Sequence, residues 1–412
     1  MARNRIIYQS QALYAGPVND ADNTDSKNKE LHRVQDISFN VDVARVDINE
    51  FGQLSQLSRE ITEPPTVSLD FSYYLHNGLN ESNLGLVVNK VDTTPKTEQT
   101  LKSCIADIID TSKDVDELNY YVITKPEGSD AHGDANNAAD DGVIAIGNGF
   151  MTSFSIEGAV GDYPTASVST EASNILFDAY GTAKNPAIDG AGAKVNAAEV
   201  IALPTSDNAL DTGEDLAGIT ALRSGDITIE FFGDTAADRD LKMGGAELPS
   251  DDTDGTGEPT SIHIQNFSVE VPLSRTAQNR IGSFFPFSRE IDFPITGSFS
   301  ISGNVADFAD GDLYDIVCGD DKKNALITFK NKCTTAAGDG ETEYQIVLKG
   351  ATLDSQNFSH GIGDQQSVDL TFSVPLGANV SSGDGIFFCG SSKGTEPVPT
   401  PSVSTSSSPD SP

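Results

Sequence analysis

The chain contains one segment twice, and this duplication constrains the fold more than any other feature of the sequence. Residues 34–69 align without a gap with residues 264–299, 230 positions later, and 13 of the 36 aligned residues are identical. The run SREI at 58–61, for example, recurs at 288–291. Repeats of about 20–50 residues form solenoids or propellers, whereas so long a period indicates repeated domains. We therefore expect two like domains.

The remaining residues divide around these two copies. We expect an N-terminal arm or loop at 1–33, the first repeat at 34–180, an insertion or linker with some strand at 181–261 and the second repeat at 262–378. The chain ends in residues rich in Pro, Ser and Thr, which cannot bury a core. Residues 379–412 are therefore expected to form a flexible tail.

Hydrophobic residues alternate with polar residues in both repeats, as in strands with one buried face. The alternation predicts strands from Ile37, from Val67, from Phe267 and from Val368, and a long one over 143–160. Residues 101–109 carry apolar side chains at helical spacing and predict one short helix. We expect a mainly β fold with a β-sandwich or barrel-like unit and a short helix in each repeat.

Acidic residues dominate the charge, with 62 Asp and Glu against 26 Lys and Arg and a net charge of −36. Such a chain is repelled by anionic membranes and lacks the basic clusters that neutralise nucleic-acid phosphates. The acidity either keeps the protein soluble or serves a specific role, and the sequence leaves both open. No apolar run predicts a signal peptide or membrane span, so we expect synthesis in a cytoplasm and no membrane insertion.

Residues that carry catalysis or hold metals do not form a recognisable pattern. The five histidines are scattered, the four cysteines contain no C-x-x-C pair, and no nucleotide-binding or nucleophile motif is present. Acidic turns at 251–254 and 310–312 lack EF-hand spacing, although they leave a calcium site open. We expect no enzyme, no cofactor and no assigned metal site.

The polar residues of the predicted strands are small or acidic, and none of them is Lys or Arg. A solvated sheet face ordinarily mixes long side chains of both signs, so this one is suited to repel a polyanion. The general scarcity of basic residues is the simpler explanation. The residues concerned are Ser38, Asn40, Asp42, Ser68, Asp70, Ser72, Ser268, Glu270, Ser298, Ser300 and Ser302.

Several stretches of the chain resemble the tail tube (major tail) proteins of tailed bacteriophages. In the first repeat the resemblance rests on residues 35–71, with NEFGQL at 49–54 and EPPTVSLDFS at 63–72. It continues in GNGFMTSF at 147–154 and PTASV at 164–168, and FSREIDFP at 287–294 adds the second repeat. Together these stretches cover most of residues 31–180 and 262–377.

The resemblance implies that the sheets of neighbouring domains join into a closed β-barrel around a lumen that conducts viral DNA during ejection. Two tube domains in one chain imply a homotrimeric ring with pseudo-sixfold symmetry, with the polar residues named above facing the lumen. Expected partners are further copies, the tail tip or baseplate, tape-measure and terminator proteins, and a sheath if the tail is contractile. Double-stranded DNA would pass without tight binding, and the protein would reside in the virion tail.

Four matched arginines are candidates for contacts within the ring, because a guanidinium forms bidentate pairs with carboxylates. They could equally cap turns inside each domain. These residues are Arg45 and Arg59 in the first repeat and Arg275 and Arg289 in the second.

A calcium-dependent surface adhesin or S-layer-like β-sandwich protein is the alternative from another class, since such proteins are also acidic and rich in Ser and Thr. The missing signal peptide and the twofold repeat speak against it. A sheath or baseplate subunit is a closer competitor, although sheath proteins are usually larger.

Overall fold

The computed structural model describes most of the two repeats. The described residues are 10–18, 28–91, 101–113, 115–127, 131, 141–179, 182–196, 200–201, 222–232, 242–243, 246–247, 262–283, 285–286, 288–305, 322–331, 341–359, 367–377 and 383–395.

Strands dominate these residues, so the fold is mainly β as expected. The first part of the chain forms β1 (Gln11–Pro17), β2 (Lys29–Leu31), β3 (Val34–Asp42), β4 (Arg45–Ile48), β5 (Ser58–Ile61), β6 (Thr66–Tyr74), α1 (Leu79–Asn83), β7 (Val88–Val91), α2 (Ala106–Ile109), β8 (Glu117–Thr124), β9 (Gly142–Ala159), β10 (Thr165–Ala172) and β11 (Asn174–Ala179).

The second part adds one 3-10 turn and eleven strands among the described residues. They are η3 (Ser224–Asp226), β12 (Ile227–Phe232), β13 (Lys242–Met243), β14 (Ala246–Glu247), β15 (Ile262–Pro272), β16 (Arg275–Gln278), β17 (Ser288–Ile291), β18 (Ile295–Val305), β19 (Lys323–Asn331), β20 (Glu341–Ser359), β21 (Ser367–Leu376) and β22 (Gly385–Thr395).

The strand order repeats together with the sequence. One half of the main sheet runs β19-β20-β21-β18-β15 and the other runs β9-β10-β6-β3, with β8 beside β9. Strand β12 pairs with β19 as β1 pairs with β8, and β22 pairs with β20 as β11 pairs with β9. Each half therefore contains the same seven strands in the same order, and β15 joins the halves by pairing with β9.

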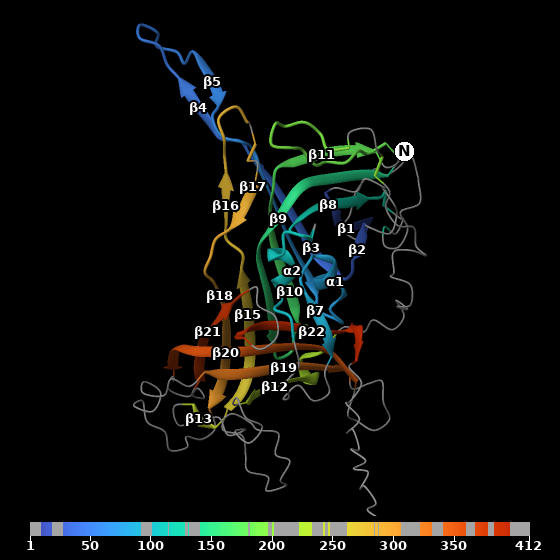
Figure 1. Cartoon of the computed structure of the whole chain (residues 1–412), viewed down its shortest axis with the longest axis vertical. Coiled ribbons are helices and arrows are strands. Elements are labelled where there is room, and N and C mark those ends of the chain that lie inside the picture. Colours follow the sequence, from blue (N-terminus) through green and yellow to red (C-terminus); the bar gives the residue numbers. More distant parts are fainter. Residues whose placement is uncertain are drawn as a thin grey trace, which may run out of the picture.

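The two longest strands connect two layers. The first half of β20 pairs with β19 and β22, and its second half pairs with β21. In Figure 1, β19, β20 and β22 run across the direction of β15 and β18. One large hydrophobic cluster fills the space between the layers and includes Phe154, Phe299 and Phe388. The rings of Phe154 and Phe388 lie 5.6 Å apart, so this core spans both repeats.

Two hairpins extend beyond the sheet at one end of the molecule (Figure 1). Strands β4 and β5 form the hairpin of the first repeat, and β16 and β17 form that of the second. Strand β16 begins 230 positions after β4, and β17 begins 230 positions after β5, as the sequence alignment requires.

Three expected boundaries need correction. Residues assigned to an N-terminal arm form β1 and β2, and residues assigned to the C-terminal tail form β22. Part of the expected linker forms β12, which pairs with β19 of the second repeat. Strands β1 and β22 were missed because they are buried on both faces and show no alternation, whereas a strand within the linker was expected.

The expected helix at 101–109 is shorter than the apolar spacing suggests. Only Ala106–Ile109 is helical, although Leu101, Cys104, Ile105 and Ile108 are buried as that spacing predicts. Within the described part of the chain, neither helix has the length and apolar character needed to cross a membrane.

Candidate assembly interface and polar sheet face

The two repeats meet in a seam, formed where residues 266–272 of β15 pair antiparallel with residues 153–159 of β9. Val269 pairs with Ile156 and Val271 pairs with Phe154, and all four side chains are at most 1% exposed. The Phe267 ring lies over the Cα of Gly158, where a Cβ atom would collide with it. The seam is therefore packed as tightly as the core of either repeat.

The strand register identifies which residues are equivalent in the two repeats. Leu69 pairs with Phe39 and Thr170, and Phe299 pairs with Val269 and Phe372. Equivalent residues therefore differ by 230 in β3 and β15 and by 202 in β10 and β21.

The β-bulges support this assignment. The register skips Gln35 in β3 and its matched Gln265 in β15, so the sequence identity at this position corresponds to a shared bulge. Strands β9 and β20 are bulged at Thr152 and Asp354, which also differ by 202.

In two places this equivalence is incomplete, because a strand edge pairs with no second strand among the described residues. Strand β3 pairs only with β6, whereas its counterpart β15 pairs on both sides. Residues 352–359 of β20 pair only with β21, whereas the matching residues of β9 also pair with β15. The β3 edge is therefore equivalent to β15, and the β20 edge is equivalent to the part of β9 that pairs with β15.

Hydrophobic residues are exposed on these two edges. Phe39 of β3 is 37% exposed and Phe358 of β20 is 39% exposed. Their equivalents are Val269 and Ile156, which are 1% and 0% exposed in the seam. An exposed apolar strand edge ordinarily invites pairing with another chain, so these edges form a candidate assembly interface.

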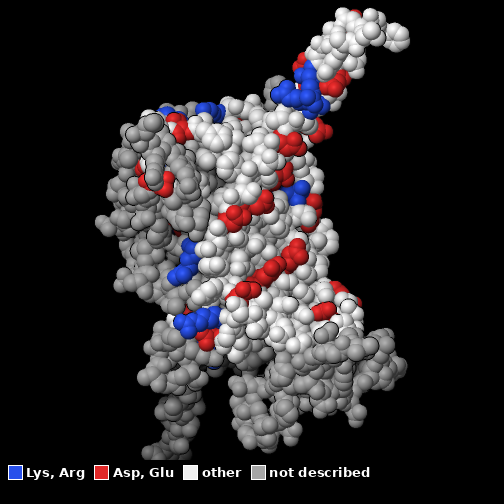
Figure 2. Space-filling view, turned by 180° about the vertical axis from the view of Figure 1, so that it is seen from behind, with Lys and Arg blue, Asp and Glu red and all other residues white. Residues whose placement is uncertain are grey.

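One face of the main sheet carries all eleven residues that the sequence assigned to a polar surface. They alternate with buried residues such as Leu69 and Phe299, and all are half-buried or exposed. The same face includes Glu157, Glu171 and Asp369, and no Lys or Arg lies among its described strand residues. Figure 2 shows acidic side chains in oblique rows on an otherwise uncharged surface, with basic residues near its borders.

Hydroxyl groups on this polar face bond to one another and to acids across the strands. Ser268 and Ser300 are joined at 2.7 Å, and Ser302 donates to Asp369 at 2.6 Å. The Ser359 and Ser367 hydroxyls are 2.9 Å apart. These short side chains give an acidic surface whose described strand residues include no Lys or Arg to hold a phosphate.

Two of the four predicted contact arginines cross the seam. The Arg275 side chain is 1% exposed, and its Nη2 lies 2.6 Å from Asp116 Oδ1, just before β8. Its Nε donates to the Met151 carbonyl at 3.0 Å. Arg289 pairs with Glu171 of β10, and the Phe150 ring lies beneath both guanidinium groups. The second hairpin is thereby fixed to the first repeat.

Arg45 and Arg59, their equivalents in the first hairpin, lack such burial. Both are exposed, and the Arg59 Nε lies 3.1 Å from Asp47 Oδ1 within its own hairpin. The four arginines therefore divide into a buried pair at the seam and an exposed pair beside the β3 edge.

The acidic partners of the buried arginines were not identifiable from the sequence. Asp116 and Glu171 have no neighbouring motif among 62 acidic residues. Burial raises the pKa of the nearby Glu117, and a hydrogen bond from Asn148 and the two guanidinium groups partly oppose that shift. Only the pairing of β9 with β15 brings these residues together.

The described residues contain no group of acids, histidines or cysteines arranged to hold a metal ion. Both acidic turns considered for calcium, at 251–254 and 310–312, lie outside the described residues. Cys104 and Cys389 are buried and are not in disulfides, and burial raises the pKa of Cys104 to about 12.

Comparison with known proteins gives little guidance. No protein family and no curated protein matches the sequence. Among solved structures, one described as "Crystal structure of Hcp protein" is similar at 12% identity with a TM-score of 0.22. The match covers 38% of this chain and 98% of that one. A likeness at this level defines neither the fold nor the function.

Proposed function

We propose that the chain is a structural, non-enzymatic protein whose copies join head to tail into rings that stack as a tube. The observation that carries this proposal is the equivalence between the internal seam and the two free edges. If β3 of one copy pairs with β20 of the next as β15 pairs with β9, Phe39 lies opposite Phe358 and Asn40 opposite Asn357. Such a heterologous interface generates a ring where its rotation closes.

Three copies would place six repeats in the ring, the arrangement implied by the resemblance to phage tail tube proteins. Ring closure would bury both apolar edges, β3 and the second half of β20. The polar face would then line the inner wall, because the hydrophobic core occupies the opposite side of the sheet.

An acidic inner wall suits the passage of double-stranded DNA. Affinity for DNA comes mainly from Lys and Arg that displace counterions from phosphates, and the polar face has none in its described strands. Its negative potential would keep the duplex from adhering. We therefore propose a phage tail tube located in the virion, with tail-tip, tape-measure, terminator and, in a contractile tail, sheath proteins as partners.

Negative-stain electron microscopy of the purified chain, with class averages over a concentration series, tests this proposal. We expect rings or tubes with threefold outlines and a pore of about 20 Å or more, wide enough for a duplex. Analytical ultracentrifugation should show a trimer and its stacks. A monomer at every concentration would contradict the proposal, and one that orders only with Ca²⁺ would favour an adhesin.

A further inference from the structure

Arg59 occupies the position in the first hairpin that Arg289 occupies in the second. Arg289 bonds to Glu171 across the seam and is 5% exposed. The Arg59 side chain is instead 64% exposed, and its partner Asp47 is 55% exposed. Such a surface ion pair contributes at most about 1 kcal/mol to stability. Its guanidinium can therefore change partner at little cost.

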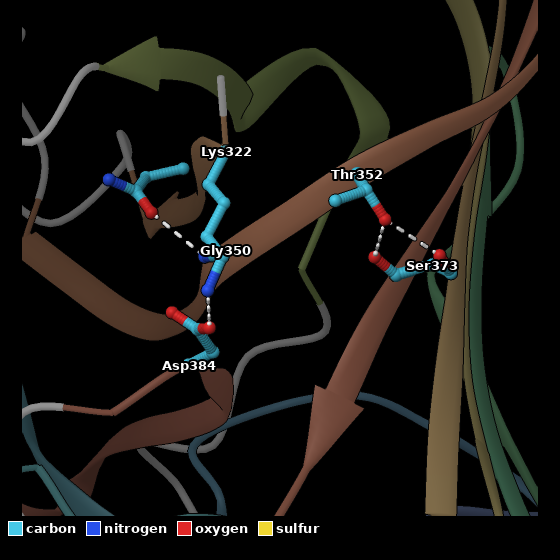
Figure 3. Close-up of polar contacts among 6 residues, drawn as sticks. Lys322, Gly350, Thr352, Ser373 and Asp384 are labelled. Atoms are coloured by element: carbon cyan, nitrogen blue, oxygen red, sulfur yellow. Dashed lines mark hydrogen bonds and ion pairs between the residues drawn. The ribbon is translucent and has the colours of Figure 1, made fainter. Parts of the chain in front are cut away.

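The receiving edge of β20 lacks the residues that hold Arg289. The register places Ser373 at the position of Glu171 and Thr352 at that of Phe150. A carboxylate nevertheless lies at this point, because the Ser373 hydroxyl donates to Asp354 Oδ1 at 3.0 Å. Figure 3 shows Ser373 beside Thr352, whose hydroxyl is 2.9 Å from that of Ser373. Asp354 is exposed and occupies the bulge equivalent to Thr152.

Ser373 Oγ corresponds to the side-chain carbon from which the Glu171 carboxyl group extends. Asp354 Oδ1 lies 3.0 Å from that atom, so a carboxylate oxygen is present close to the position equivalent to the Glu171 carboxyl group. We propose that, on assembly, Arg59 of one copy leaves Asp47 and pairs with Asp354 of the next copy. This inference rests on the proposed head-to-tail assembly and identifies the charge pair that selects the partner.

Because of Lys322, Arg45 is less suited than Arg59 to form the ion pair with the next copy. Lys322 corresponds to Glu117, which lies near Arg275 and Arg289 in the seam. Lys322 is held by Asp384 on the second repeat (Figure 3). A cation at this position opposes Arg45, whereas Asp354 offers Arg59 an acid.

Charge reversal tests the pair. We expect Arg59→Glu and Asp354→Arg each to raise the concentration needed for ring formation by about tenfold or more, since each places like charges together. The double variant Arg59→Glu/Asp354→Arg should restore assembly to near the wild-type concentration. Sedimentation velocity over a dilution series measures the change.

Matched variants separate this contact from effects on folding. Asp162→Arg changes the same charge on the exposed turn after β9 and should assemble like the wild type. Asp47→Asn removes only the internal partner of Arg59 and should leave assembly intact. Single variants that assemble normally, or a double variant that is not rescued, would overturn the Arg59–Asp354 pair alone. A wild-type chain that never assembles would overturn the proposed function as well.

Discussion

Val269 of β15 lies opposite Ile156 of β9, and this pair joins the two repeats inside one chain. The equivalent residues, Phe39 and Phe358, lie at opposite edges of the sheet and remain partly exposed. The β9–β15 contact thus forms inside the chain, whereas the equivalent edges of β20 and β3 do not pair with each other. Gene duplication followed by fusion of head-to-tail subunits would produce this arrangement.

Equivalent substitutions at these sites should have different consequences. Phe39→Asp should leave the fold intact and abolish ring formation, because the carboxylate would be buried only in the assembly. Val269→Asp should destabilise the monomer by about 3 kcal/mol or more, because it places an unpaired charge in the core. Urea denaturation and sedimentation velocity distinguish the two outcomes.

Phe177→Asp is the matched control, since Phe177 is 63% exposed on β11, away from both edges. It should neither unfold the chain nor prevent assembly. Normal rings from Phe39→Asp would argue against β3 as an assembly edge.

The two classes of arginine should also differ in their effect on stability. Arg275→Ala removes a buried guanidinium that contacts Asp116 and the carbonyls of Met151 and Arg289. We expect a loss of about 2–4 kcal/mol in the free energy of unfolding. Arg59→Ala should change the stability of the monomer by no more than about 0.5 kcal/mol. Equal effects of the two substitutions would contradict the assignment of Arg275 to a structural clamp.

Much of the fold follows from the sequence where one strand face is buried and the other is not. Strands β3, β6, β15 and β21 show this alternation, and the duplicated SREI run marks β5 and β17. Strand β8 could not be found in this way because seven of its eight residues are buried, so both of its faces are apolar. Strands β1 and β22 escape detection for the same reason.

The candidate interface was only partly predictable. The polar face could be assigned because its residues occupy every second position of the alternating strands. The seam could not, because it pairs strands about 110 residues apart, and residue spacing contains no information on that register. The four arginines were identified from the repeat. Their division into buried and exposed pairs depends on which hairpin lies against the other repeat of the same chain, and the sequence does not show this.

A buried carboxyl group should make stability depend on pH. Burial raises the pKa of Glu81 in α1 to about 7, and its Oε1 accepts a hydrogen bond from Tyr73 at 2.9 Å. The folded state therefore favours protonated Glu81. The resulting contribution to the free energy of unfolding is fully present below about pH 4.5 and is lost as the pH rises through 7. Glu81→Gln should stabilise the monomer by up to about 3 kcal/mol at pH 8 and little at pH 4.5.

His76 acts in the opposite direction, and the two groups can be separated. Burial, together with His32 and Arg33, lowers the pKa of His76 to about 3, so its contribution is present above about pH 6.5 and lost as the pH falls. Denaturant curves from pH 4.5 to 8 should show the gain from Glu81→Gln only toward the alkaline end. Glu60→Gln, on the exposed hairpin, is the control and should show no such trend. A gain of equal size at every pH would rule out titration of Glu81 as its cause.

The charge of the polar face should decide whether the assembled protein retains DNA. Glu157, Glu270 and Asp369 are exposed on this face, in β9, β15 and β21 respectively. Replacing all three with Lys adds six positive charges per chain relative to the wild type and supplies cations that release counterions from phosphates. We expect wild-type tubes to pass labelled duplex DNA unbound at about 0.15 M salt, and tubes of the triple variant to retain it.

Co-sedimentation of tubes with the labelled duplex measures retention, and increasing salt should release the DNA from the triple variant. Lys substitutions at Asp110, Glu127 and Asp189, which are exposed outside the polar face, make the same change in charge and provide the control. If the control tubes retain DNA equally well, net charge alone explains the effect. If only the polar-face variant retains it, the acidic surface faces the duplex, as a conduit for DNA requires.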